Sequence, residues 1–93
     1  YRVIPGDIAT ADLVMTQSSV NYDRTGFQQD ANVVFPIDRL RELENAEEIG
    51  EVADYHYAIN GAGWLPHEIE PTARELAGLL KEDGVNAVLL VPV

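Results

Sequence analysis

The chain lacks cysteine, is poor in basic residues and contains no long apolar run. Without a thiol, its 93 residues exclude disulfides, thiolate catalysis and thiolate metal sites within this sequence. Only 6 Lys and Arg face 16 Asp and Glu, and the resulting charge of −10 repels nucleic acid backbones and anionic membrane surfaces, so neither is expected as a partner. No apolar stretch approaches the roughly 20 residues of a membrane helix, and no signal peptide is visible. The default expectation is a cytoplasmic protein.

The composition is that of a globular protein. Hydrophobic residues make up 46% of the chain and charged residues 24%, which are not the values of a disordered segment. Residues 1–93 are therefore expected to form a single α/β domain. Because the sequence opens on Tyr1 and closes directly after an apolar run, we expect it to be a fragment of a longer chain.

Apolar periodicity predicts a helix that begins at Pro36. Ile37, Leu40 and Leu43 recur at helical spacing, and proline is well tolerated at a first helical position. Gly50 is expected to end this helix in a left-handed cap.

A strand, a helix and a second strand are predicted in the remainder of the chain. Residues 51–60 alternate as a strand does, and residues 71–83 carry a buried helical stripe that Gly84 ends. Residues 87–91 are wholly apolar, which is typical of a parallel strand covered on both faces. The predicted fold is α/β, with βαβ units and a parallel sheet flanked by helices, as in part of a Rossmann or flavodoxin-like layer.

The densest signal is the polar stretch of residues 18–32, which runs into Val33 and Phe35. It mixes aromatic, acidic and amide side chains with one Arg and one Gly. A solvated linker is richer in Gly, Ser and Pro. Ordered loops of this composition usually carry function.

Together with several shorter blocks, this stretch resembles the selenoprotein B-like proteins of the glycine/sarcosine/betaine reductase and D-proline reductase family. The likeness covers nearly the whole chain and is strongest in its first block. The matching blocks are Ser19-Val20-Asn21-Tyr22-Asp23-Arg24-Thr25-Gly26-Phe27-Gln28-Gln29-Asp30, Val33-Val34-Phe35-Pro36-Ile37-Asp38-Arg39-Leu40, Ile49-Gly50, Asp54-Tyr55-His56-Tyr57, Glu70-Pro71-Thr72-Ala73-Arg74-Glu75 and Asp83-Gly84-Val85.

The resemblance implies a thiol- or selenol-dependent reductive cleavage of a C–N bond in a small amino acid or related compound. In that family a Cys-Pro-x-Cys or Sec-Pro-x-Cys motif follows the strand that matches residues 87–93, so the catalytic Cys or Sec is expected after Val93. It implies no cofactor in this segment and a pyruvoyl group on a partner subunit. The expected partners are a small amino-acid-like substrate and either other reductase subunits or further copies of the chain. The segment by itself is expected to be inactive.

The residues expected to contact substrate come mainly from the polar stretch. Arg24 offers a planar fork of donors to a carboxylate. The amides and acids around it have the groups to orient a zwitterion, and a histidine in the predicted strand has the chemistry for proton transfer. The full set is Asn21, Asp23, Arg24, Gln28, Gln29, Asp30 and His56.

Structural interpretations of the same residues stay open. Asp23 and Arg24 are also typical of a turn held by an internal ion pair. The polar residues among 28–32 are also typical of side chains that form hydrogen bonds with loop backbone. His56 is equally a core or rim histidine, and a Ser18/Ser19, His56 and Asp23 set lacks a nucleophile elbow. Residue types that can ligate a metal occur at Asp54, His67, Glu68 and Glu70, but their spacing is weak evidence and we predict no metal site. The apolar pair Trp64 and Leu65 is expected either to meet a partner or to cover the sheet edge.

A second function, from a different class, fits the same residues. A non-catalytic α/β module that docks a partner protein also needs a scaffold, an acidic surface and an exposed apolar pair. Continuation of the parent gene beyond Val93 with a Cys or Sec motif would favour the reductase.

Overall fold

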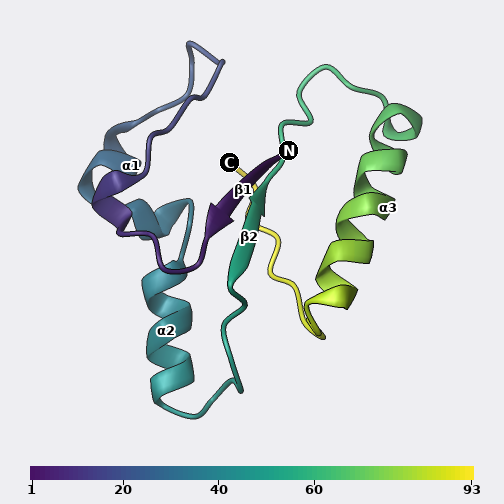
Figure 1. Ribbon diagram of the computed structural model, residues 1–93. Helices are drawn as coiled ribbons and strands as arrows, with labels where there is room; N and C mark the ends of the chain where they lie inside the picture. Colours follow the sequence, from purple (N-terminus) through teal and green to yellow (C-terminus); the bar gives the residue numbers. More distant parts are fainter. The chain divides into compact units, whose positions relative to one another are not determined.

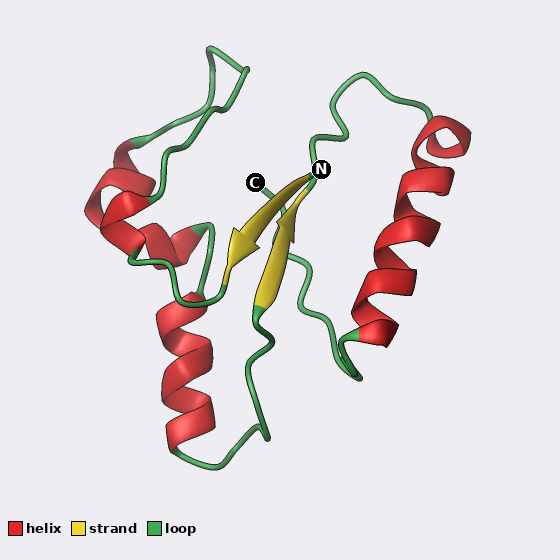
Figure 2. Cartoon of the chain, in the orientation of Figure 1, coloured by secondary structure: helices red, strands yellow, loops and turns green.

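The computed structural model describes residues 1–93, which form three α-helices, two short 3-10 helices and two strands (Figure 1; Figure 2). They fall into two compact units: residues 1–5 with 53–89, and residues 6–52 with 90–93. Each unit is described by itself, and the single-domain organisation stays a prediction. No helix combines the length and apolar character needed to cross a membrane. The elements in chain order are β1 (Arg2–Pro5), η1 (Thr10–Asp12), α1 (Thr25–Gln29), η2 (Ala31–Val33), α2 (Ile37–Asn45), β2 (Tyr55–Ala58) and α3 (Pro66–Glu82).

In the first unit, β1 and β2 form a two-stranded antiparallel sheet. Arg2 lies opposite Ala58, and Pro5 lies opposite Tyr55. The Tyr1 ring packs edge-on against Tyr57, with ring centroids 5.8 Å apart. The Tyr1 hydroxyl also donates a 2.8 Å hydrogen bond to Glu75 of α3. Tyr1, the residue before β1, thus contacts both β2 and α3.

The predicted parallel βαβ layer is wrong. The sheet has two strands, which run antiparallel to each other. Residues 87–93 form no strand, and Figure 2 shows the C-terminal segment as a loop. An apolar run indicates that its side chains prefer burial, but it does not say which backbone supplies the hydrogen bonds of a strand. Here β1, which is distant in sequence, pairs with β2 instead.

Helix α3 is longer than predicted and begins five residues earlier. Its N-terminus has one half of a capping box: the Glu68 carboxylate accepts a 2.7 Å hydrogen bond from the Leu65 backbone N–H. Leu76, only 5% exposed, is the buried side chain of this unit.

The C-terminus of α3 is as predicted. Gly84 adopts φ +73°. The Val85 N–H donates to Leu80 O at 2.9 Å, and the Gly84 N–H donates to Lys81 O at 3.1 Å, which is the Schellman pattern. Glu70 and Arg74, spaced i,i+4 on this helix, form an ion pair at 2.6 Å.

In the second unit, α2 begins at Ile37, with Pro36 as its N-cap, and ends at Asn45. Ile37 is fully buried, whereas Leu43 at the far end of the predicted stripe is 42% exposed. The predicted left-handed cap at Gly50 is wrong, because Glu47 takes that conformation, with φ +60°. The same Schellman bonds close this helix end: the Glu48 N–H donates to Leu43 O, and the Glu47 N–H donates to Glu44 O, both at 2.9 Å.

The two Schellman caps predict opposite effects for matched substitutions. A side chain in the left-handed region is strained, and Glu47 also places negative charge at a helix C-terminus. We expect Glu47→Gly to raise the free energy of unfolding by about 1 kcal/mol and Gly84→Ala to lower it by a similar amount. Urea denaturation of both variants and the unchanged protein measures this, and a destabilised Glu47→Gly variant would contradict it.

Candidate functional site

The polar stretch is an ordered loop closed by its own side chains. Arg24 Nη2 donates a 2.9 Å hydrogen bond to the backbone carbonyl of Gln17, which joins the middle of the loop to the residue that precedes it. Asp23 Oδ1 accepts a 2.8 Å hydrogen bond from the Thr25 N–H at the start of α1. Asp23 and Arg24 do not form the ion pair that the structural interpretation required, because the ion pairs of the chain all involve other residues.

The second half of the loop is held by Asp30 and Asn32. Asp30 Oδ1 accepts from both the backbone N–H and the side-chain amide of Asn32, each at 2.9 Å. This is an Asx turn, in which a side chain takes over a backbone role. The interpretation that these polar groups bond loop backbone is therefore confirmed for Asp30.

Asn32 also joins the loop to α2. Its Oδ1 accepts a 3.0 Å hydrogen bond from the Asp38 N–H, and its Nδ2 donates to Asp38 Oδ2 at 3.1 Å. The first contact caps the N-terminus of α2, for which Pro36 offers no side-chain acceptor. Asp38 Oδ1 receives Arg41 Nη1 at 3.1 Å, and Arg41 Nη2 donates to the carbonyl of Gly6. One polar chain thus runs from the loop through α2 to the segment after β1.

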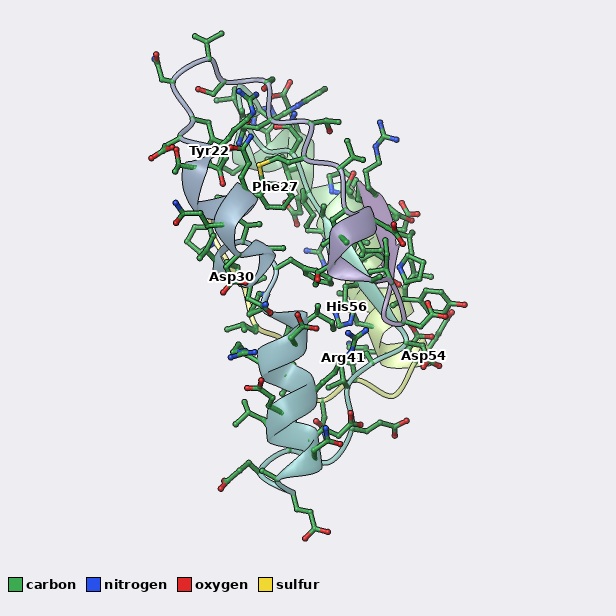
Figure 3. All side chains as sticks on the ribbon, turned by 90° about the vertical axis from the view of Figure 1, so that its left-hand side faces the viewer. Tyr22, Phe27, Asp30, Arg41, Asp54 and His56 are labelled. Atoms are coloured by element: carbon green, nitrogen blue, oxygen red, sulfur yellow. The ribbon has the colours of Figure 1, made fainter.

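A shallow hollow of about 320 Å³ lies beside α1. Phe27 gives it an apolar surface, and Gln28 and Gln29 give it amide groups; Figure 3 shows Phe27, Tyr22 and Asp30 within this part of the chain. The complete lining is Thr10, Ala11, Leu13, Phe27, Gln28, Gln29 and Ala31. No charged side chain lines it.

The two aspartates of the loop stay ionised to a lower pH than ordinary aspartates. The backbone hydrogen bond from Thr25 is the main cause that lowers the pKa of Asp23 below its ordinary value. The side-chain hydrogen bond from Asn32, followed by its backbone N–H, lowers the pKa of Asp30. Both shifts arise because the donors stabilise the ionised carboxylate.

The structure brings six of the seven predicted contact residues into the second unit and leaves one in the first. Asn21, Asp23 and Arg24 precede α1, and Gln28 to Asp30 belong to α1 and its C-cap. His56 lies in β2, half-buried and opposite Ile4. Their contact with substrate stays a prediction.

The weaker chemical patterns receive little geometric support. No three His, Asp or Glu side chains come together in a way that suits a metal ion. Of the four residues in the metal pattern, Glu68 caps α3 and Glu70 pairs with Arg74. Trp64 and Leu65 are each 58% exposed, so more than half of each residue's surface is uncovered.

Sequence reasoning missed the residues that hold the loop in place. Asn32 was weighed as a backbone-bonding residue, but its two contacts with Asp38 and the Arg41–Gly6 bond were not foreseen. The sequence did contain a signal. Asp30-Ala31-Asn32 is an Asp-x-Asn pattern, which favours an Asx turn, and Asp38 follows Asn32 by six residues in the first turn of a predicted helix.

Acidification is expected to loosen the loop at a lower pH than ordinary carboxylates titrate. Because both folded-state pKa values are depressed, the stabilisation is complete above about pH 5 and is lost as the pH falls through the unfolded and then the folded pKa values. NMR titration of the Thr25 and Asn32 amides measures the two midpoints. Asp23→Asn, which keeps an acceptor for Thr25, should abolish the Thr25 titration alone. A Thr25 midpoint at or above pH 4 in the unchanged protein would contradict the assignment.

Removal of the Asn32 side chain is expected to destabilise the second unit more than an ordinary loop substitution. Asn32→Ala loses three side-chain hydrogen bonds, one of which caps α2, at a cost of about 2 kcal/mol. Asn21→Ala is the matched control, because its side chain makes no hydrogen bond within the protein. Urea denaturation compares the two, and equal losses would refute the anchoring role of Asn32.

Comparison with known proteins gives the chain a family. The profile described as Glycine/sarcosine/betaine reductase selenoprotein B (GRDB) matches residues 8–93. The chain is 37% identical to the D-proline reductase subunit gamma of Acetoanaerobium sticklandii, over 97% of its own length and 37% of that protein. It is 38% identical to the Sarcosine reductase complex component B subunit beta of Peptoclostridium acidaminophilum, over 97% of its length and 20% of that protein.

A third relative, the Glycine reductase complex component B subunit gamma of Symbiobacterium thermophilum, is 44% identical over 74% of the chain and 16% of that protein. The chain thus spans a little more than a third of the D-proline reductase subunit and a smaller part of the other two relatives. No solved structure matches it. The resemblance found in the sequence is confirmed: the chain belongs to the glycine/sarcosine/betaine reductase selenoprotein B family.

Proposed function

We propose that the chain is part of a reductase-complex subunit that cleaves a C–N bond in a small amino acid or related compound, and that its polar loop contacts the substrate. The family match carries the proposal, since it spans residues 8–93 and so includes the whole loop. The relatives are named for D-proline, glycine, sarcosine and betaine. Each of these compounds joins a carboxylate to a nitrogen, so carboxylate recognition is the requirement they share.

Arg24 is the residue best suited to receive that carboxylate. Its bond to Gln17 holds the guanidinium in place, yet its partner is a neutral carbonyl, so its positive charge is not neutralised. The remaining donors of the fork contact no protein acceptor. Three other arginines, by contrast, are each paired with a carboxylate: Arg39, Arg41 and Arg74. An anchored guanidinium with donors to spare suits bidentate binding of a carboxylate.

Residues close to Arg24 in the sequence carry complementary groups for the nitrogen end of such a substrate. Asp23 and Asp30 are ionised, and each has acceptor capacity beyond its backbone bonds. Gln28 and Gln29 present amides to the hollow beside α1, and Phe27 presents an apolar face. Asn21 also belongs to the proposed set of polar contacts. His56 lies in the first unit, so its proposed contact with substrate rests on the sequence alone.

The redox step requires groups outside these residues, because the chain has no cysteine. Reductive cleavage breaks the C–N bond and places one hydrogen on carbon and one on nitrogen. A dithiol, or a thiol with a selenol, supplies the two electrons and two protons as it oxidises to a disulfide or selenenyl sulfide. We propose that this Cys or Sec lies elsewhere in the protein and that the pyruvoyl group belongs to a partner subunit in the cytoplasm. Residues 1–93 alone would bind but not reduce.

The second candidate, a non-catalytic assembly module, is favoured by one observation. Trp64 and Leu65 stand next to each other at the start of α3, each 58% exposed. Exposed tryptophan is typical of protein interfaces. The two candidates differ in what they require of Arg24, because an assembly module has no need of an unneutralised guanidinium in the loop.

Arg24→Ala in the full-length protein is expected to weaken carboxylate binding much more than it weakens folding. Loss of the single exposed bond to Gln17 costs about 1 kcal/mol of stability or less, whereas loss of a bidentate clamp should reduce affinity by about tenfold or more. Calorimetric titration with the amino acid substrates named above, alongside thermal unfolding, measures both quantities.

Arg24→Lys is the matched control. Lysine keeps the charge but loses the planar fork, so it should retain the folding stability and recover only part of the affinity. If Arg24→Ala lowers the melting temperature sharply and leaves affinity untouched, Arg24 is part of the scaffold, and the assembly module becomes the better reading.

A further inference from the structure

The loop between β2 and α3 contains the only Asn-Gly step of the chain. The other asparagines are followed by larger residues: Tyr22, Val33, Ala46 and Ala87. Asn60 and Gly61 are both exposed, and they lie outside any helix or strand. An asparagine in that setting is open to attack by the backbone nitrogen of the next residue, since glycine has no Cβ to obstruct the approach and moves freely between conformations.

Two hydrogen bonds describe the geometry of this loop. Asn60 Oδ1 accepts a 3.1 Å hydrogen bond from the Ala62 N–H, and Gly61 O accepts a 3.2 Å hydrogen bond from the Trp64 N–H. The first bond folds the Asn60 side chain back along the main chain, over Gly61, and draws electron density from the amide. The amide carbon is thereby made more electrophilic.

We propose that Asn60 is a modification site at which the chain deamidates through a succinimide. The Gly61 nitrogen, after loss of its proton to solvent base, forms a bond to Asn60 Cγ. The bond from Cγ to the side-chain nitrogen breaks, and ammonia leaves with the proton it takes up. Water then opens the ring at one of its two carbonyls, which gives either aspartate or isoaspartate. No oxidant, reductant or cofactor takes part.

The reaction changes the loop that carries Trp64 and Leu65. Both products add a negative charge to a chain already at −10. Isoaspartate also inserts a methylene into the main chain and shortens the side chain, so the 3.1 Å contact with Ala62 cannot be kept. Trp64 is the single tryptophan, and its backbone is bonded to Gly61, so its fluorescence reports on the change.

The test is incubation of the full-length protein at mildly alkaline pH, followed by peptide mapping with mass spectrometry and enzymatic methylation of isoaspartate. We expect Asn60 to be converted first, well ahead of the exposed Asn86, at a rate that rises with pH. Trp64 fluorescence should change in step with the conversion.

Gly61→Ala is the matched variant. A Cβ at Gly61 meets Ile69 Cδ1 at 3.6 Å, an ordinary contact, so the loop accepts the methyl group while attack on Asn60 is obstructed. Conversion of Asn60 should then slow by about tenfold or more, and Asn86 should be unaffected. Conversion of Asn86 as fast as Asn60, or an undiminished rate in Gly61→Ala, would overturn the proposal.

Discussion

The hydrogen-bonded pair of Asn32 and Asp38 is the contact on which the second unit depends. It caps α2 at the point where Pro36 provides no acceptor, and it holds the polar loop against that helix. Arg41 extends the pair to the backbone of Gly6. Ile37, the fully buried side chain of this unit, lies between Pro36 and Asp38. With so small an apolar core, directional polar contacts carry much of the order.

Shortage of positive charge gives Arg24 its significance. In a chain with 6 basic and 16 acidic residues, a guanidinium would be expected to pair with a carboxylate. Arg39, Arg41 and Arg74 do so. Arg2 forms no such pair, and Arg24 binds the Gln17 carbonyl, while its neighbour Asp23 accepts the Thr25 N–H at the start of α1. The loop thus keeps an anchored cation and two acidic side chains close in sequence, and the proposed binding of a zwitterion rests on this arrangement.

The apolar residues near the C-terminus have the opposite character. Val88, Leu89 and Leu90 are 57%, 62% and 82% exposed, although their sequence is that of a buried strand. Leu76 is the only buried side chain of the first unit. The chain spans 37% of its D-proline reductase relative and 20% of its sarcosine reductase relative.

The sequence by itself determined the family, the polar loop, the Schellman cap at Gly84 and the Glu70–Arg74 pair, because each depends on residues close together in the chain. Only the tertiary structure decided that β1 pairs with β2, that residues 87–91 form no strand, and that Asn32 bonds to Asp38. Strand pairing depends on backbone groups far apart in sequence, and side-chain patterns do not specify them. The left-handed residue is likewise Glu47 and not Gly50, because the helix ends at Asn45. The strain at Glu47 is offset by the two Schellman hydrogen bonds that its conformation permits.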